Sequence, residues 1–134
     1  MKKLISVMLL LACASGFTQE TSKANRWVWV LEGRAAHKYI DPTTIRNRGD
    51  TATVWALWNS KDDSAQGPLS YKVFEEYSCG EPMVRSLALS AYADYFAEGM
   101  TLINAPLVEE QMTWSAIADG SVPAKLQKVL CGWD

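Results

Sequence analysis

The central part of the chain alternates between apolar and polar residues as β-strands do. Positions 51–59 are predicted as a strand, in which 53–58 are apolar on both alternations, as expected for a central strand covered on both faces. Positions 70–78 alternate, with one side formed by Tyr71, Val73 and Tyr77. Positions 83–91 alternate in the same way, so the pattern predicts three successive strands joined by short connections.

Shorter strands are predicted on both sides of this central block. Residues 26–31 are aromatic and β-branched, and residues 37–40 form a second short strand that ends at an expected turn, 41–44. Positions 99–103 and 112–114 are predicted as further strands. Five or six strands in sequence with short turns predict antiparallel pairing.

One helix is predicted at the C-terminal end of the chain. Ser121 can cap it, Pro123 is tolerated in its first turn, and Gly132 ends it. The apolar stripe comprises Val122, Leu126, Val129 and Leu130. The outer side is expected to hold Lys125, Gln127 and Lys128. A single apolar stripe needs a sheet to pack on, so the predicted fold class is α+β, an antiparallel sheet with one C-terminal helix.

The first twelve residues have the pattern of an export signal. Lys2 and Lys3 precede a nine-residue apolar run that ends at Ala12, which is too short to span a bilayer. Residues 13–25 are expected to form a polar tether, and residues 26–134 are long enough for a single domain. We therefore expect a protein that functions outside the inner membrane.

Cys13 leaves two interpretations of the signal open. Residues 10–13 fit a lipobox, which predicts cleavage before Cys13 and a lipid on its thiol. In the other interpretation, cleavage occurs near residues 14–18 and Cys13 is removed. The protein is then either an outer-membrane-anchored lipoprotein or periplasmic, and it contacts the membrane only through the lipid.

The expected mature chain is acidic. Removing Lys2 and Lys3 leaves 11 of the 13 basic residues against 15 acidic ones, a net charge of about −4. The charges are scattered along the chain without a long block of one sign. Such a surface does not favour nucleic acid as a partner.

Two cysteines remain in the expected domain, Cys79 and Cys131, and an oxidising compartment favours their pairing. Their bond would close a loop of 52 residues, which corresponds to roughly 4 kcal/mol in the chain-entropy model. On an ideal helix Cys131 lies half a turn away from Val122 and from the apolar stripe. The helix is therefore expected to end by Leu130, so that Cys131 can turn toward Cys79.

The residue patterns give no indication of catalysis, a cofactor or a metal. No nucleophile, phosphate-loop or zinc-protease motif occurs, and His37, the single histidine, is expected on a surface strand or turn. Glu75 and Glu76 are neighbours on a predicted strand, so they point to opposite faces and cannot form a one-sided catalytic pair. We expect both to be solvated, like the pair Glu109 and Glu110, and we predict a protein that is not an enzyme.

Six tryptophans are the unusual feature of the composition. Trp27 and Trp29 share one face of a predicted strand, whereas Trp55 and Trp58 lie on opposite faces. Packing in the core is the first interpretation. The alternative is an aromatic surface for a protein partner or for self-association, which includes a possible homodimer.

Three groups of residues resemble the surface-adhesin protein E-like domains of Gram-negative bacteria. The first group is Tyr39–Ile45, followed by Gly49 and by Thr53–Trp55. The second is Glu76–Cys79, followed by Arg85–Leu87. The third is Trp114, Gly120–Pro123 and Cys131, although Asp119 stands where that family has a proline. The resemblance as a whole covers about residues 26–131.

This resemblance implies a curved antiparallel sheet, a C-terminal helix packed on it and a Cys79–Cys131 bond. It also implies a non-enzymatic envelope protein that binds another protein, either a host matrix protein or an envelope component. No residue in the sequence identifies that partner. The alternative function is a periplasmic binding or inhibitor module for a small ligand or an envelope enzyme.

Overall fold

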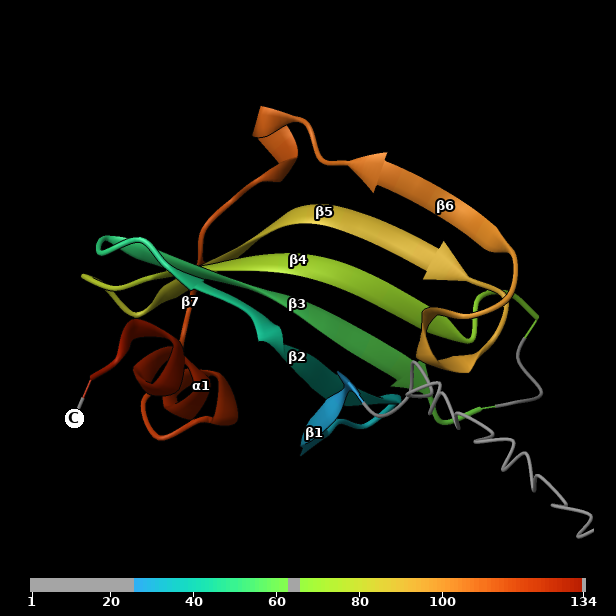
Figure 1. The fold of residues 1–134 in the computed structure, drawn as a ribbon, viewed down its shortest axis with the longest axis horizontal. Coiled ribbons are helices and arrows are strands. Elements are labelled where there is room, and N and C mark those ends of the chain that lie inside the picture. The colour runs from blue at the N-terminus through green and yellow to red at the C-terminus, as the bar shows by residue number, and fades with distance from the viewer. Residues whose placement is uncertain (1–25, 63–65, 134) are drawn as a thin grey trace, which may run out of the picture.

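The computed structural model describes residues 26–62 and 66–133, and the expected signal and tether, including Cys13, lie outside them. One antiparallel sheet carries the fold, with the strand order β1-β2-β3-β4-β5-β6 and a short β7 beside β5 (Figure 1). This confirms the predicted α+β class. The strands are β1 (Val28–Glu32), β2 (Ala36–Asn47), β3 (Thr51–Ser60), β4 (Ser70–Ser78), β5 (Met83–Tyr92), β6 (Thr101–Pro106) and β7 (Ser115–Ala116).

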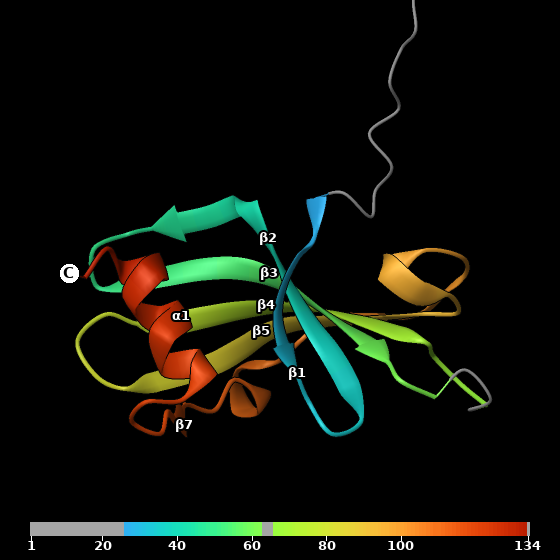
Figure 2. The same cartoon turned by 90° about the horizontal axis from the view of Figure 1, so that it is seen from below.

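The helix α1 (Val122–Cys131) covers one end of one face of the sheet, which we call the helix face (Figure 2). Alternation along β3 directs Ala52, Val54 and Ala56 toward this face, and all three are fully buried. The core beneath the helix consists of these residues together with Ile40, Tyr77, Ile117, Leu126 and Leu130. The opposite side of the sheet is called the outer face.

The second strand is longer than predicted, because β2 continues through the expected turn at 41–44 to Asn47. Its pairing with β3 shifts register between Asp41 and Arg46. The pairing with β1 ends at Ile40, so this half of β2 is a sheet edge, where Pro42 removes no ladder hydrogen bond. The turn residues predicted from sequence therefore mark an irregularity inside a strand.

Two other strand predictions are wrong in position. The segment after β5 first forms a short 3-10 turn, η2 (Tyr95–Ala97), so β6 begins at Thr101 rather than at 99. Positions 112–114 follow a second 3-10 turn, η3 (Glu109–Gln111), and do not form the strand. Instead Trp114 packs against the Arg85 guanidinium at 4.4 Å, and pairing in β7 starts one residue later.

The disulfide is present, with a Cα–Cα distance of 5.6 Å between Cys79 and Cys131. The predicted fraying of the helix is wrong, because α1 continues through Cys131 and ends at Gly132, whose φ is 68°. The buried side of α1 includes Gln127, which is 3% exposed, whereas Val129 is 69% exposed. Cys131 lies one turn beyond Gln127 and faces the β4–β5 connection with it.

The hydrogen bonds of Gln127 explain why this residue, and not Val129, lies on the buried side of α1. Its Nε2 donates to the backbone oxygens of Ser78 and Glu81, next to Cys79. A buried amide is stable when both hydrogen bonds are made, so a polar residue occupies the core side of the helix. Within the described residues, no helix is long and apolar enough to cross a membrane.

Candidate functional site

An apolar groove lies on the helix face beyond the end that α1 covers. We call it the hairpin groove, because one wall is the turn between β1 and β2. Its volume is about 450 Å³, and it is lined by Gly33, Arg34, Ala35, Ala36, Trp58, Tyr71, Val73 and Leu89. The register places Trp58 opposite Tyr71 and Val73 opposite Leu89, so three neighbouring strands contribute its floor.

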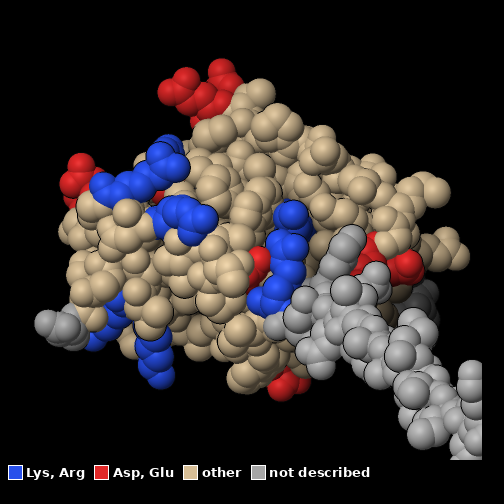
Figure 3. Space-filling view, in the orientation of Figure 1, with Lys and Arg blue, Asp and Glu red and all other residues tan. Residues whose placement is uncertain are grey.

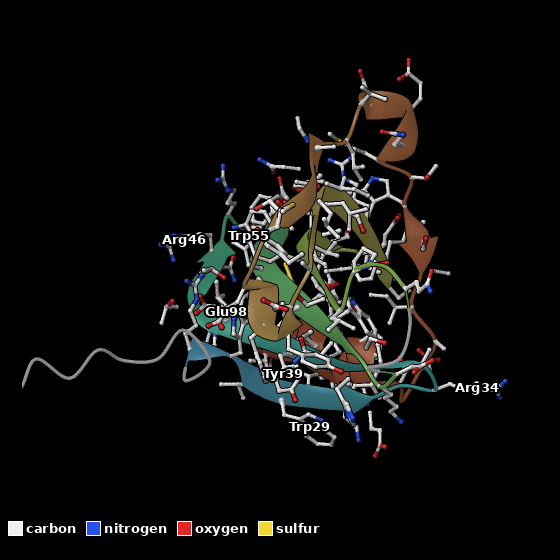
Figure 4. The ribbon with its side chains drawn as sticks, turned by 90° about the vertical axis from the view of Figure 1, so that its right-hand side faces the viewer. Trp29, Arg34, Tyr39, Arg46, Trp55 and Glu98 are labelled. Carbon is white, nitrogen blue, oxygen red and sulfur yellow. A yellow bond between two sulfur atoms is a disulfide. The ribbon has the colours of Figure 1, made fainter. Side chains whose placement is uncertain are left out.

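Small residues in the β1–β2 turn keep the hairpin groove open. A Cβ on Gly33 would approach the backbone oxygen of Ala36 to 2.8 Å and the Trp58 ring to 3.7 Å. The amide of Gly33 also donates to that same oxygen at 2.9 Å. Arg34, at the tip of the turn, is exposed and projects away from the sheet (Figure 4). The guanidinium forms no ion pair or hydrogen bond with another described residue.

A buried ion pair lies between the groove and the core. The Lys38 Nζ lies 2.6 Å from Oε1 and 3.0 Å from Oε2 of Glu75, and the Tyr77 hydroxyl donates to Oε2 at 3.0 Å. Lys38 also stands over the ring of Trp58, at 5.1 Å from its centroid. Burial, and then the Glu75 carboxylate, raises the pKa of the Tyr77 hydroxyl. The pair therefore ties the groove floor to the core.

The prediction that Glu75 and Glu76 are solvated is wrong, although they do face opposite sides. Glu75 is only 6% exposed because its partner Lys38 reaches it from β2, two strands away. Glu76 lies on the outer face and pairs with Arg85 at 2.7 Å. Glu109 and Glu110 are exposed, as expected.

Aromatic residues also gather on the outer face. Trp55 stacks on Phe74 at 4.9 Å between ring centroids, and Tyr39 meets Phe96 edge-on at 5.3 Å. Figure 4 shows Tyr39 next to the turn that carries Glu98. The turn η2 therefore covers part of the outer face.

The six tryptophans divide between the two interpretations. Trp27 is buried, and Trp55, Trp58 and Trp114 are half-buried. Trp29 and Trp133 are exposed, by 57% and 41%. Core packing accounts for the first four only in part, because Trp58 also forms the floor of the hairpin groove.

His37 lies on β2, opposite Asn59 and Glu32, and is half-buried. Among the residues that the structure describes, no group of three histidine, cysteine or acidic side chains is arranged to hold a metal. The cysteines of the domain are joined in the disulfide. Of the sequence-predicted site residues, Cys79 and Cys131 are thus brought together, and the lipidation of Cys13 stays a prediction.

In the part of the chain that the structure describes, one antiparallel sheet, a helix tied to it by the disulfide and an apolar groove beyond that helix define a small α+β domain. The sequence profile of the family described as Surface-adhesin protein E matches residues 27–132. This chain belongs to that family. Membership of a surface-adhesin family implies an exported, envelope-associated protein.

Solved structures of Haemophilus influenzae protein E have the same fold. Crystal form II has a TM-score of 0.58 at 10% identity, over 80% of this chain and 87% of that one. The selenomethionine form has a TM-score of 0.57 at 12% identity, over 80% and 86%. Protein E of a non-typeable strain has a TM-score of 0.56 at 11% identity, over 78% and 75%. Among curated proteins, none matches this chain.

Proposed function

We propose that this chain is a non-enzymatic adhesin of the bacterial envelope, and that it binds another protein through the hairpin groove. The observation that carries the proposal is an apolar groove of about 450 Å³ with Trp58 and Tyr71 side by side on its floor. Aromatic residues in such settings contribute most of the binding energy at protein interfaces. The family membership supports an adhesive role.

The rim of the groove favours a partner that carries a negatively charged group beside its apolar contact. Arg34 stands at the mouth without a partner among the described residues, so it is available for a carboxylate of the bound protein. Arginine is enriched at interfaces together with tryptophan and tyrosine. We therefore propose an apolar anchor from the partner in the groove and an acidic residue beside it.

The test is binding of the oxidised domain to purified host matrix proteins and to envelope fractions, measured by biolayer interferometry. Ala35 is exposed and lines the groove, so Ala35→Glu introduces a charge there without disturbing the core. We expect Ala35→Glu and Trp58→Ala to weaken binding at least about tenfold, as loss of a hot spot does. Trp133→Ala, an exposed tryptophan outside the groove, is the matched control and should bind like wild type.

Thermal melts decide whether Trp58→Ala has lost binding through unfolding. Unchanged binding by a folded Ala35→Glu variant would contradict the proposed groove.

The groove volume also lies within the range of small-ligand sites, roughly 300–1,000 Å³, so a small-ligand module is the second candidate. For such a module, a small molecule extracted from the envelope should bind in the groove, and no protein of the panel should bind there.

We propose that Cys13 carries the lipid that anchors the domain, since residues 10–13 fit a lipobox. Cys13→Ser is expected to move the protein from the membrane fraction to the soluble fraction, or to leave it unprocessed. Mass spectrometry of the wild-type protein should find a lipidated cysteine as the first residue. A mature N-terminus beyond residue 13 would refute the anchor. The possible homodimer stays a prediction.

A further inference from the structure

A second, smaller pocket lies on the outer face, away from the hairpin groove. We call it the outer pocket. Its volume is about 240 Å³, and it is lined by Arg26, Trp27, Lys72, Tyr92, Phe96 and Ala97. Two cationic side chains and three aromatic rings thus face one small space. Figure 3 shows a patch of basic surface in the middle of the face that it displays, with a small acidic area beside it.

Lys72 has no carboxylate partner within the described residues. Its ammonium lies over the Trp55 ring, 4.5 Å from the centroid, and the residue is half-buried. Burial, and then the charge of Arg26, lowers the pKa of Lys72, while Asp41 acts in the opposite direction. A partly desolvated cation of this kind is stabilised when an anion binds beside it.

Asp41, the nearby acid, is already occupied by other groups. Its Oδ2 accepts from Arg26 Nε at 2.8 Å, and its Oδ1 accepts from the Thr43 amide at 3.0 Å and from the Thr43 hydroxyl at 2.6 Å. Among the described residues Asp41 forms its ion pair with Arg26 and none with Lys72, although its charge still acts on Lys72. Arg26 bonds Asp41 through Nε, its guanidinium lies over the Trp27 ring at 5.2 Å from the centroid, and the residue lines the pocket.

The part of the pocket wall that η2 contributes has a fixed shape. Phe96 and Ala97 adopt φ values of 57° and 58°, which are uncommon for residues other than glycine. The Phe96 amide donates to Asn59 Oδ1 and the Ala97 amide to Ser70 Oγ, each at 2.9 Å, and both acceptors are buried in the sheet. Backbone strain that the surrounding structure holds in place is found at binding sites.

We propose that the outer pocket binds a carboxylate attached to an apolar or aromatic body. Arg26, Lys72 and Asp41 together carry one net positive charge, which matches a singly charged anion. The rings of Trp27, Tyr92 and Phe96 provide contacts for the attached body. This site is independent of the hairpin groove, since the two lie on opposite faces of the sheet and share no residue.

Phenylacetate is the probe, and phenylacetamide is its neutral counterpart of nearly the same shape. Titration of the isotope-labelled oxidised domain should shift the Trp27 indole and Ala97 amide signals in a saturable way with phenylacetate. Phenylacetamide should bind at least about tenfold more weakly, which corresponds to the loss of one charge-assisted contact of about 1.4 kcal/mol. Equal binding of the two compounds would overturn the proposal.

Variants test the assigned cation. Lys72→Gln should weaken phenylacetate binding about tenfold, and Lys72→Arg should retain most of it. Lys125→Gln, an exposed lysine on α1, is the matched control and should bind like wild type. If Lys72→Gln does not fold, Arg26→Gln takes its place, because Arg26 is exposed. A folded Lys72→Gln or Arg26→Gln variant with unchanged affinity would refute the site.

A final comparison distinguishes a free carboxylate from one carried by a protein. The blocked dipeptide acetyl-phenylalanyl-glutamate amide and its glutamine counterpart are titrated in the same way. Tighter binding of the glutamate form than of phenylacetate assigns the site to acidic side chains of a partner protein. Tighter binding of phenylacetate assigns it to small free acids. Binding of neither carboxylate contradicts the proposal, whatever the hairpin groove binds.

Discussion

Replacing Lys38 with methionine is expected to lower the free energy of unfolding by about 3–5 kcal/mol. The substitution removes the cation that lies 2.6 Å from Glu75 and leaves a carboxylate that is only 6% exposed. The Tyr77 hydroxyl would remain as the donor to that carboxylate. One neutral donor does not replace the ammonium group, so the uncompensated charge carries most of the loss.

The double variant Lys38→Met with Glu75→Gln separates this cause from simple loss of packing. It should regain most of the lost stability, because the buried charge is gone while an acceptor for Tyr77 remains. Lys61→Met is the control, since Lys61 pairs with the exposed Glu32 at the surface. Its urea midpoint should match that of wild type. A double variant as unstable as Lys38→Met alone would show that packing around the lysine is responsible.

Removing the disulfide by Cys79→Ala with Cys131→Ala is expected to lower stability by about 2–5 kcal/mol. The bond joins the β4–β5 connection to the last residue of α1, across 52 residues of sequence. Without it, Gln127 and the apolar contacts of Leu126 and Leu130 must hold the helix on the sheet. We expect hydrogen exchange in α1 to accelerate more than exchange in β3.

Denaturant melts of oxidised and reduced wild-type protein provide the corresponding measurement without substitution. The oxidised form should unfold at the higher denaturant concentration, with the difference expected from the double variant. Identical midpoints would contradict the energetic role of the bond, even though the bond is present. A serine pair at the same positions fills more of the half-buried site than alanine does but forms no bond, so it separates loss of the bond from loss of packing.

Strands in the middle of the sheet could be predicted from sequence because packing on both faces fixes their pattern. The range 70–78 is the observed β4, and β3 differs from its prediction by one residue. At the edges, one side of each strand is free, so turn residues such as Pro42 occur within a strand. The start of β6 depends on η2, whose two left-handed residues are not glycines and leave no mark in the sequence.

The helix and the site show where a local pattern is insufficient. Gln127 was assigned to solvent because its two acceptors lie far away in the chain, at Ser78, the end of β4, and at Glu81, in the β4–β5 connection. Glu75 was likewise expected to be solvated, and no role was predicted for Lys38, although each lies two positions from a core residue, Tyr77 or Ile40. That spacing places both on the helix face and was the available signal for the pair. The hairpin groove, by contrast, requires knowledge of where α1 ends over the sheet.

Hydrogen–deuterium exchange of the domain, alone and saturated with the protein that it captures from the matrix or envelope panel, tests the central claim most directly. We expect protection in the β1–β2 turn at 33–36 and around Trp58, Tyr71 and Leu89, with little change in β6. We also expect Ala35→Glu to abolish this protection. Protection confined to the outer face or to β6, with the hairpin groove exchanging as in the free domain, would contradict that claim.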